Sequence, residues 1–76
     1  MNIQKQVFEI IANVLNVNID EIKSESTIGD FHSWDSLGQL NILQMVQEQF
    51  GIEFDFEEMM DMENVNDIIK SVESKL

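Results

Sequence analysis

The chain has 76 residues with neither cysteine nor proline, and its 15 acidic residues against four basic ones give a formal net charge of −11 at pH 7. This length suits a single small core, so we expect residues 1–76 to form one domain. The lack of cysteine excludes disulfide bonds and thiolate metal sites, and the negative charge argues against nucleic acid as a partner.

The start of the chain and its charge indicate where the protein works. Met1 to Lys5 is followed by no long apolar run, so the sequence predicts neither a signal peptide nor a membrane span. Without cysteine, the cytoplasm is the expected compartment. The acidic charge either steers the protein toward partners with basic patches or only keeps a small monomer soluble, and composition leaves both open.

The first part of the chain predicts one helix followed by a long connector. Apolar residues recur at the spacing of one helical face over about residues 2 to 15. They are Ile3, Val7, Ile10, Ile11, Val14 and Leu15. From residue 16 to residue 35 the chain is mostly polar with isolated apolar residues, and such a long connector must be anchored or functional. We expect its apolar residues, Phe31 and Trp34 above all, to pin it to the core.

A second helix is predicted over about residues 36 to 50, with Asp35 as its N-cap and Gly51 as its stop. An inward arc is predicted for Leu40, Ile42, Leu43, Val46 and Phe50. The opposite side carries Leu37, Asn41, Met45 and Glu48. Two apolar side chains on this largely polar face predict a docking stripe. Gly38 costs about 1 kcal/mol against alanine, which indicates either close approach by another group or tolerance near a helix end.

Two further helices complete the predicted fold. Asp55 and Glu58 form a capping pair for a short helix over about residues 56 to 61, and Asn64 is the expected cap of the last helix. The apolar face of that last helix is predicted as Val65, Ile68, Ile69, Val72 and Leu76. The predicted fold class is all-α, a small four-helix bundle with a short third helix and a long loop between the first two helices.

Ser36 stands at the predicted start of the second helix. Backbone N–H groups and the positive end of the helix dipole favour anionic oxygens there, which suits a phosphate. Asp35 and Ser36 are also common helix-start residues for capping alone. From these residues by themselves, capping is the simpler interpretation.

The stretch Phe31-His32-Ser33-Trp34-Asp35-Ser36-Leu37-Gly38-Gln39-Leu40 resembles the prosthetic-group site of the acyl and peptidyl carrier proteins, and the order of elements is similar over nearly the whole chain. The resemblance implies a carrier and not an enzyme. It implies that a phosphopantetheinyl transferase moves 4′-phosphopantetheine from coenzyme A onto Ser36, where the arm holds acyl or aminoacyl thioesters for loading and synthase enzymes. Asp35 would cap the helix and help place the metal during modification, and Leu37 would contact the transferase and other partners.

The second helix differs from the pattern of one branch of the family. Carriers of bacterial fatty acid synthesis usually bear acids along the second helix, whereas residues 36 to 47 contain no charged side chain. The negative charge lies instead in residues 48 to 67. The chain is therefore more similar to carriers of a specialised pathway. The expected partner contacts are Leu37, Asn41, Met45, Glu48 and Glu57.

The methionines predict a cavity for the cargo. Their flexible, polarizable side chains suit a gap that opens for an acyl chain between the second and third helices, although core filling is an alternative for each of them. The expected cavity residues are Leu40, Val46, Met59, Met60, Met62 and Ile68.

Two rival functions come from other classes. An acidic helical adaptor would act only by protein contact, with Ser36 as a plain cap. A hydrolase would use His32, Asp35 and Ser36, but these crowd into five positions with no evident oxyanion hole. Residues 55 to 67 lack the central glycine and ligand spacing of a calcium loop, so we expect no metal site.

Overall fold

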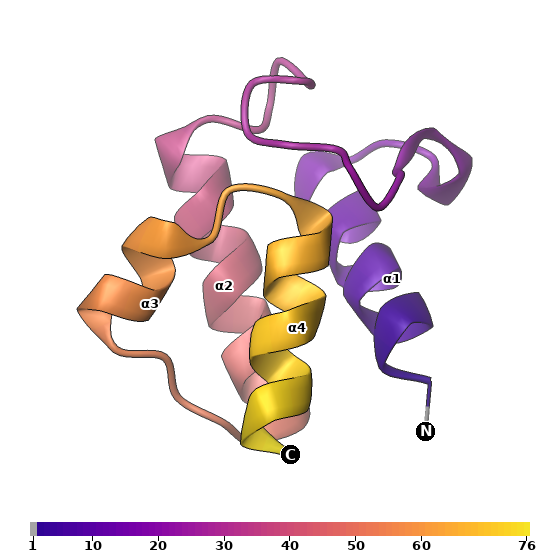
Figure 1. The fold of residues 1–76 in the computed structure, drawn as a ribbon. Helices are drawn as coiled ribbons and strands as arrows, with labels where there is room; N and C mark the ends of the chain where they lie inside the picture. The colour runs from indigo at the N-terminus through magenta and orange to yellow at the C-terminus, as the bar shows by residue number, and fades with distance from the viewer. Residues whose placement is uncertain (1) are drawn as a thin grey trace.

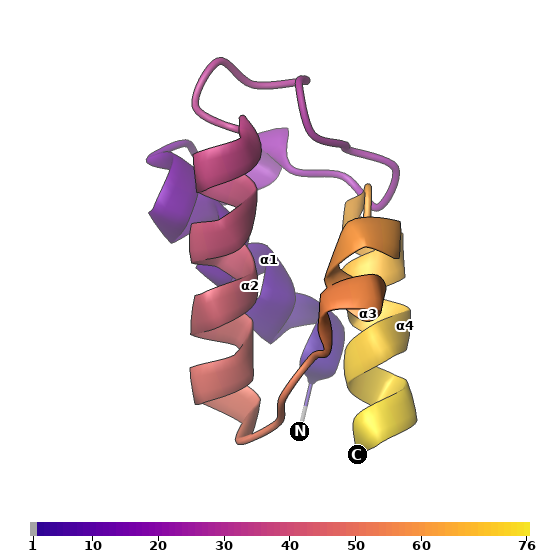
Figure 2. The ribbon, with the colours of Figure 1, turned by 90° about the vertical axis from the view of Figure 1, so that its left-hand side faces the viewer.

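The computed structural model describes residues 2–76, so Met1 of the predicted domain lies outside the described residues. Within this range the elements are α1 (Ile3–Leu15), the 3₁₀ turn η1 (Ile19–Glu21), α2 (Ser36–Phe50), α3 (Phe56–Asp61) and α4 (Val65–Lys75). The three longer helices lie alongside one another, and α3 flanks them on the side away from α1 (Figure 1). The connection between α1 and α2 crosses one end of the bundle (Figure 2). The predicted all-α bundle with a short third helix is confirmed.

The helices begin and end where the local signals predict. The side chains of Asp35, Asp55 and Asn64 each accept a backbone N–H in the first turn of their helices. Asp55 and Glu58 form the predicted reciprocal capping box, with N–H to carboxylate distances of 2.8 and 3.0 Å. Gly51 ends α2 with a φ of 65°, a conformation that glycine adopts without strain.

The core lies where α1, α2 and α4 meet. Its fully buried side chains are Val7, Ile11, Trp34, Ile42, Leu43, Val46, Val65, Ile68 and Val72. Two expectations for these faces are wrong. Leu40 is 54% exposed, because Gln39 takes the inward position at this level of α2 and Leu40 turns toward a hollow that separates α2 from α3. Leu76 follows the last residue of α4 and is 62% exposed.

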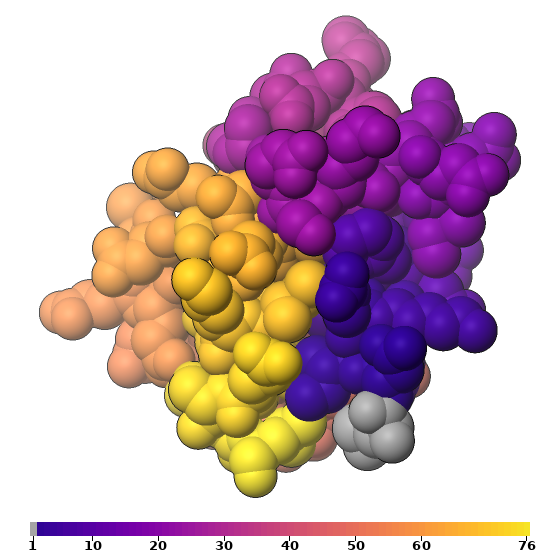
Figure 3. All heavy atoms as spheres, turned by 45° about the vertical axis from the view of Figure 1, so that its right-hand side comes forward, coloured from indigo at the N-terminus to yellow at the C-terminus, as the bar shows by residue number. Residues whose placement is uncertain are grey.

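The connection between α1 and α2 is fastened at several points along its length. Its backbone accepts the amide of Asn66 at Ser24 and that of Val65 at Ser26, both at 3.0 Å. Ile28 N–H donates to the carbonyl of Glu63 at 3.2 Å. Figure 3 shows this part of the chain lying against the first turns of α4.

Side chains complete the anchoring that the sequence predicts. Ile22 and Trp34 are buried, and the Phe31 ring stacks on the Trp34 ring with centroids 6.5 Å apart. Ile19 and Ile28 remain exposed, so they contribute little to the anchoring. The connection between α1 and α2 is therefore held by backbone hydrogen bonds at one end of α4 and by aromatic packing just before α2.

A glycine is needed at position 38 because the connection between α1 and α2 passes close to its Cα atom. A Cβ atom at this position would lie 2.4 Å from the carbonyl oxygen of Ser33, well inside van der Waals contact. The opposing atom belongs to the backbone, which the Ser33 hydroxyl further fixes by donating to the Leu15 carbonyl at 3.0 Å. Of the two predicted explanations for this glycine, close approach is confirmed.

Among residues 2–76, no helix is both long enough and apolar enough to span a bilayer.

We expect Gly38→Ala to lower the free energy of unfolding by about 1–3 kcal/mol, because the added methyl group must push the Ser33 backbone away. Urea denaturation followed by Trp34 fluorescence measures this change. Gln44→Ala, an exposed position on the same helix, is the control. An alanine at 38 that stabilises the protein by about 1 kcal/mol, as helix propensity alone predicts, would contradict the steric explanation.

Candidate functional site

Ser36 is the first residue of α2, and its side chain is exposed. Asp35 organises this helix start: its carboxylate accepts the Gly38 N–H at 2.9 Å, and its backbone carbonyl accepts the Gln39 N–H at 2.9 Å. The hydroxyl of Ser36 thus stands at the positive end of a 15-residue helix, in a place that another molecule can reach.

A hollow of about 440 Å³ opens between α2 and α3 beside Ser36. Its walls are mostly apolar. They comprise Ile28, Ser36, Gln39, Leu40, Leu43, Phe56, Met59, Met60, Met62 and Glu63. Its volume lies within the range of about 300–1,000 Å³ typical of small-molecule sites. An apolar chain attached at Ser36 therefore has a cavity next to its point of attachment.

The structure brings only part of the predicted cavity set together. Leu40, Met59, Met60 and Met62 line the hollow, as expected. Val46 and Ile68 do not, because both are fully buried in the core that α2 and α4 share with α1.

Besides Ser36, five lining residues are absent from the predicted cavity set, namely Ile28, Gln39, Leu43, Phe56 and Glu63. Phe56 is 72% exposed at the first position of α3, and an aromatic residue at the start of so short a helix was the available signal. Gln39 lies among apolar neighbours in the sequence and carries no such signal.

Gln39 connects three segments at the edge of this hollow. Its side-chain carbonyl accepts the Trp34 indole N–H at 2.8 Å, and its side-chain N–H₂ donates to the backbone carbonyl of Met62 at 2.9 Å. Gln39 is buried, and so are both partner residues. Every buried side-chain nitrogen and oxygen in residues 2–76 has a hydrogen-bond partner. The network is therefore complete, as buried polar groups require.

Ser36 also lines a second hollow of about 430 Å³, whose other lining residues belong to the connection between α1 and α2. His32 and Asp35 line it together with Ser36, so the three residue types of a hydrolase triad do come together. However, the Asp35 carboxylate accepts from the Gly38 backbone, and no hydrogen bond joins His32 to either partner in the described part of the chain. A base oriented by a carboxylate is not assembled here.

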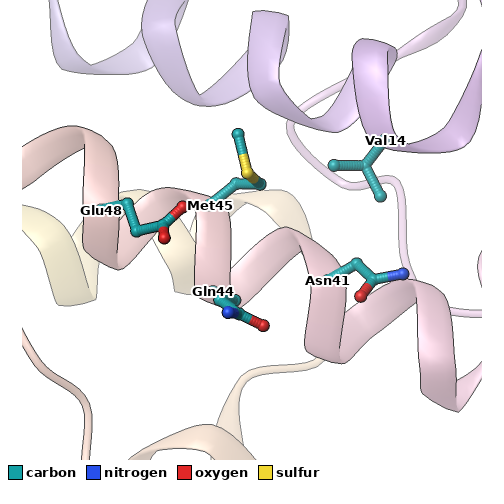
Figure 4. Close-up of a pocket in the computed structure, with 5 residues that line it drawn as sticks. All are labelled: Val14, Asn41, Gln44, Met45 and Glu48. Carbon is teal, nitrogen blue, oxygen red and sulfur yellow. The ribbon is translucent and has the colours of Figure 1, made fainter.

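The four residues of the predicted docking stripe, Leu37, Asn41, Met45 and Glu48, are all exposed on α2. Asn41, Met45 and Glu48 line a groove of about 400 Å³ with Val14 and Gln44. Figure 4 shows Met45 reaching from α2 toward α1, where Val14 faces it, while Gln44 turns away.

The other two expected partner contacts lie outside this groove. Leu37 is 71% exposed, and it belongs to the first turn of α2 beside Ser36. Glu57 is exposed on α3. Three of the five expected residues therefore line the groove, Leu37 lies one turn before Asn41 on the same helix, and Glu57 lies on α3.

Acidic and basic groups fasten α3 to the end of α4. Lys75 Nζ lies 3.0 Å from Glu58 Oε1 and 5.9 Å from the centre of the Phe54 ring. The pKa of Glu58 lies below its ordinary value because the carboxylate accepts the Asp55 backbone N–H and, secondly, because Lys75 donates to it. No group of three or more potential ligand side chains placed to hold a metal ion occurs within residues 2–76.

A family model and individual proteins both match this chain over nearly its whole length. Residues 5–72 match the family model described as a phosphopantetheine attachment site. Acyl carrier proteins of Buchnera aphidicola and Wolinella succinogenes are each 31% identical, the first over 72 residues and the second over 74. These matches cover 95% of this chain and 87% of the first relative, and 97% of this chain and of the second relative. An acyl carrier protein of Nitratidesulfovibrio vulgaris is 28% identical over 75 residues, or 99% of both chains.

We expect the charge of Glu58 to stabilise the fold in a pH-dependent way. A carboxylate whose pKa is lowered by folding adds stability above its unfolded pKa, and that stability is lost as the pH falls through the folded pKa. The stability advantage of wild type over Glu58→Gln should therefore be constant near neutral pH and shrink below about pH 4.5.

Urea denaturation at a series of pH values measures this difference. Glu57→Gln, at the exposed neighbouring position, is the matched control. The same pH dependence for both variants would show that the Glu58 contacts are not its cause.

Proposed function

This chain belongs to the family of proteins with a phosphopantetheine attachment site, and we propose that Ser36 is the residue that carries the group. The family match and the acyl carrier relatives cover nearly the whole chain, so the protein is an acyl carrier with covalently attached 4′-phosphopantetheine. The adaptor that acts by contact alone is not favoured. The exposed position of Ser36 at the first residue of α2, where it helps to line two hollows, carries the assignment.

The residues around Ser36 fit the group. A phosphate on its hydroxyl meets the positive end of α2, and Asp35 keeps the first turn in place by accepting the Gly38 N–H. When attached, the group supplies a terminal thiol that holds an acyl chain as a thioester. Ser36 is then an attachment residue and not a nucleophile that turns over. We propose that residues 1–76 act as one such carrier domain.

The hollow between α2 and α3 suggests the chemistry of the cargo. Its walls are mostly aliphatic, methionine and phenylalanine side chains, with Ser36, Gln39 and Glu63 as the polar exceptions. A charged amino group would lose its hydration in such a cavity, which is costly unless the charge is paired. We therefore favour an uncharged apolar acyl chain over an aminoacyl group.

The partners we propose are a phosphopantetheinyl transferase, a loading enzyme and downstream synthase enzymes. Leu37 would contact them beside the attachment point, and the groove of Asn41, Met45 and Glu48 would accept an apolar side chain. Because residues 36 to 47 carry no charge, acids farther along such as Glu57 would supply the electrostatic steering. This distribution supports a specialised pathway.

We also propose an oligomeric state and a cellular compartment. A net charge of −11 opposes self-association, which supports a monomer. The free thiol of the arm must stay reduced between loading steps, which supports a reducing compartment such as the cytoplasm.

Incubation with coenzyme A, Mg²⁺ and a broad-specificity phosphopantetheinyl transferase should raise the intact mass by one phosphopantetheine. Ser36→Ala should show no gain, because the acceptor hydroxyl is gone, whereas Ser33→Ala, which removes a nearby serine hydroxyl, should gain like wild type. A wild-type protein that is folded by circular dichroism but gains no mass would reject Ser36 as the attachment residue.

Leu37→Ala should slow modification by the same transferase about fivefold to tenfold, the usual loss for a partner anchor. Its free energy of unfolding should change by no more than about 0.5 kcal/mol, because the side chain is 71% exposed. Steady-state kinetics and urea denaturation measure the two effects. Leu76→Ala, at an exposed leucine at the other end of the bundle (Figure 1), is the matched control and should change neither. A large loss of stability in Leu37→Ala would contradict the proposed contact.

A further inference from the structure

The segment that carries α3 is buried at its two ends, whereas between them it is held only by the partly buried Met59 and the Glu58–Lys75 ion pair. Phe54, before the helix, and Met62, after it, are 6% and 5% exposed. Between them, no residue of α3 is fully buried, and Phe56 and Met60 are largely exposed. This segment forms one wall of the hollow beside Ser36.

Each end of this segment is held by a glutamine of α2. Gln39 donates to the backbone carbonyl of Met62 at 2.9 Å, and Gln47 accepts the backbone N–H of Phe54 at 2.8 Å. The two glutamines are eight positions apart, or about 12 Å along a helix. The structure therefore contains two side-chain clamps, one near Ser36 and one toward the far end of α2.

The side-chain amide of neither glutamine can flip, exchanging its oxygen and nitrogen, without losing a hydrogen bond. The Trp34 indole only donates and the Met62 carbonyl only accepts, so both ends of the Gln39 amide are determined by their partners. At the other clamp, Gln47 donates to the Leu43 carbonyl at 3.2 Å while it accepts from Phe54. Each clamp thus has one defined arrangement.

We propose that Gln39 and Gln47 determine the length of apolar acyl chain that the hollow can shelter. This inference rests on the proposed function of Ser36 and the hollow. A chain attached at Ser36 enters beside Gln39 and extends along α2 between Leu40 and Leu43 on one side and α3 on the other. The loose middle of α3 allows the hollow to widen. Neither Gln47 nor Phe54 lines the hollow, but Gln47 lies one helical turn beyond Leu43, which does. A chain that extends past Leu43 would therefore meet the Gln47–Phe54 bond, which would limit the sheltered length.

Gln47→Met tests this limit because it keeps the length of the side chain but cannot accept the Phe54 N–H. Gln39→Met is less suitable, since it leaves buried groups of Trp34 and Met62 unpaired and endangers the fold itself. Gln44→Met makes the same substitution at an exposed position of α2 and is the matched control. Gln47→Glu retains an acceptor for the Phe54 N–H but loses the donation to the Leu43 carbonyl, so the wild-type length limit should remain even if the overall stability falls.

The experiment loads Ser36 with acyl-phosphopantetheine groups of increasing chain length, from acyl-coenzyme A donors and a broad-specificity transferase. The rate at which hydroxylamine cleaves each thioester then reports how well the cargo is sheltered. In wild type, protection should rise with length up to a limit. In Gln47→Met the limit should move to longer chains, with about fivefold or greater extra protection beyond the wild-type limit, the factor expected for one hydrogen bond.

Three results would overturn the inference. One is a Gln47→Met profile equal to that of Gln44→Met, and another is a change of the same factor at every length, which general loosening would produce. The third is a Gln47→Glu profile that follows Gln47→Met. Failure of every variant to accept an acyl group at Ser36 would instead reject the proposed function, and this inference with it.

Hydrogen exchange of the Phe54 amide gives a test without mutation. In the loaded wild-type protein this amide should exchange faster once the acyl chain exceeds the sheltered length, because the cargo then competes with the clamp. Exchange that is the same for all chain lengths would contradict a clamp at this end.

Discussion

The arrangement around Ser36 depends on the side-chain amide of Gln39. This amide joins the connection at Trp34, the first turns of α2 and the chain between α3 and α4 at Met62. All three residues are buried, so loss of one bond would leave its partner without hydration or a substitute. Such a network acts as a unit. It fixes the loop that leads to Ser36 relative to one wall of the hollow, and so links the proposed attachment point to the space beside it.

Firm and loose parts of the fold serve different steps of carrier function. The bundle of α1, α2 and α4 has a continuous apolar core, which holds the start of α2 in one position for an incoming transferase. By contrast, α3 is six residues long, buries no residue fully and is held by the bonds at its ends and by the Glu58–Lys75 ion pair. Elements with few buried contacts open at low free-energy cost. The cavity wall can therefore move while the attachment residue stays in place.

Local signals predicted the fold well and the cavity only in part. Caps such as Asp35, Asn64 and Gly51 act within one helical turn, so the sequence contains the information for helix boundaries. The orientation of Leu40 depends on Gln39 facing inward to bond Trp34 and Met62. Both partners lie outside α2, so the periodicity of that helix does not reveal these bonds. Val46 and Ile68 are predicted to line the cavity but lie in the core, because helical periodicity shows that a face is apolar and not which neighbour it contacts. Gly38 was ambiguous until the position of the Ser33 carbonyl was known.

The hydrogen bonds between the connection and the start of α4 have a consequence for how the site forms. Thr27 pairs with Asn64 in an isolated bridge and bonds to Glu63, 36 positions along the chain. Contacts between such distant positions carry the entropic cost of closing a long loop, so they persist only when both segments are ordered. A short peptide with the sequence around Ser36 therefore has the motif but not its surroundings. What an enzyme meets at this serine is a product of the whole folded chain.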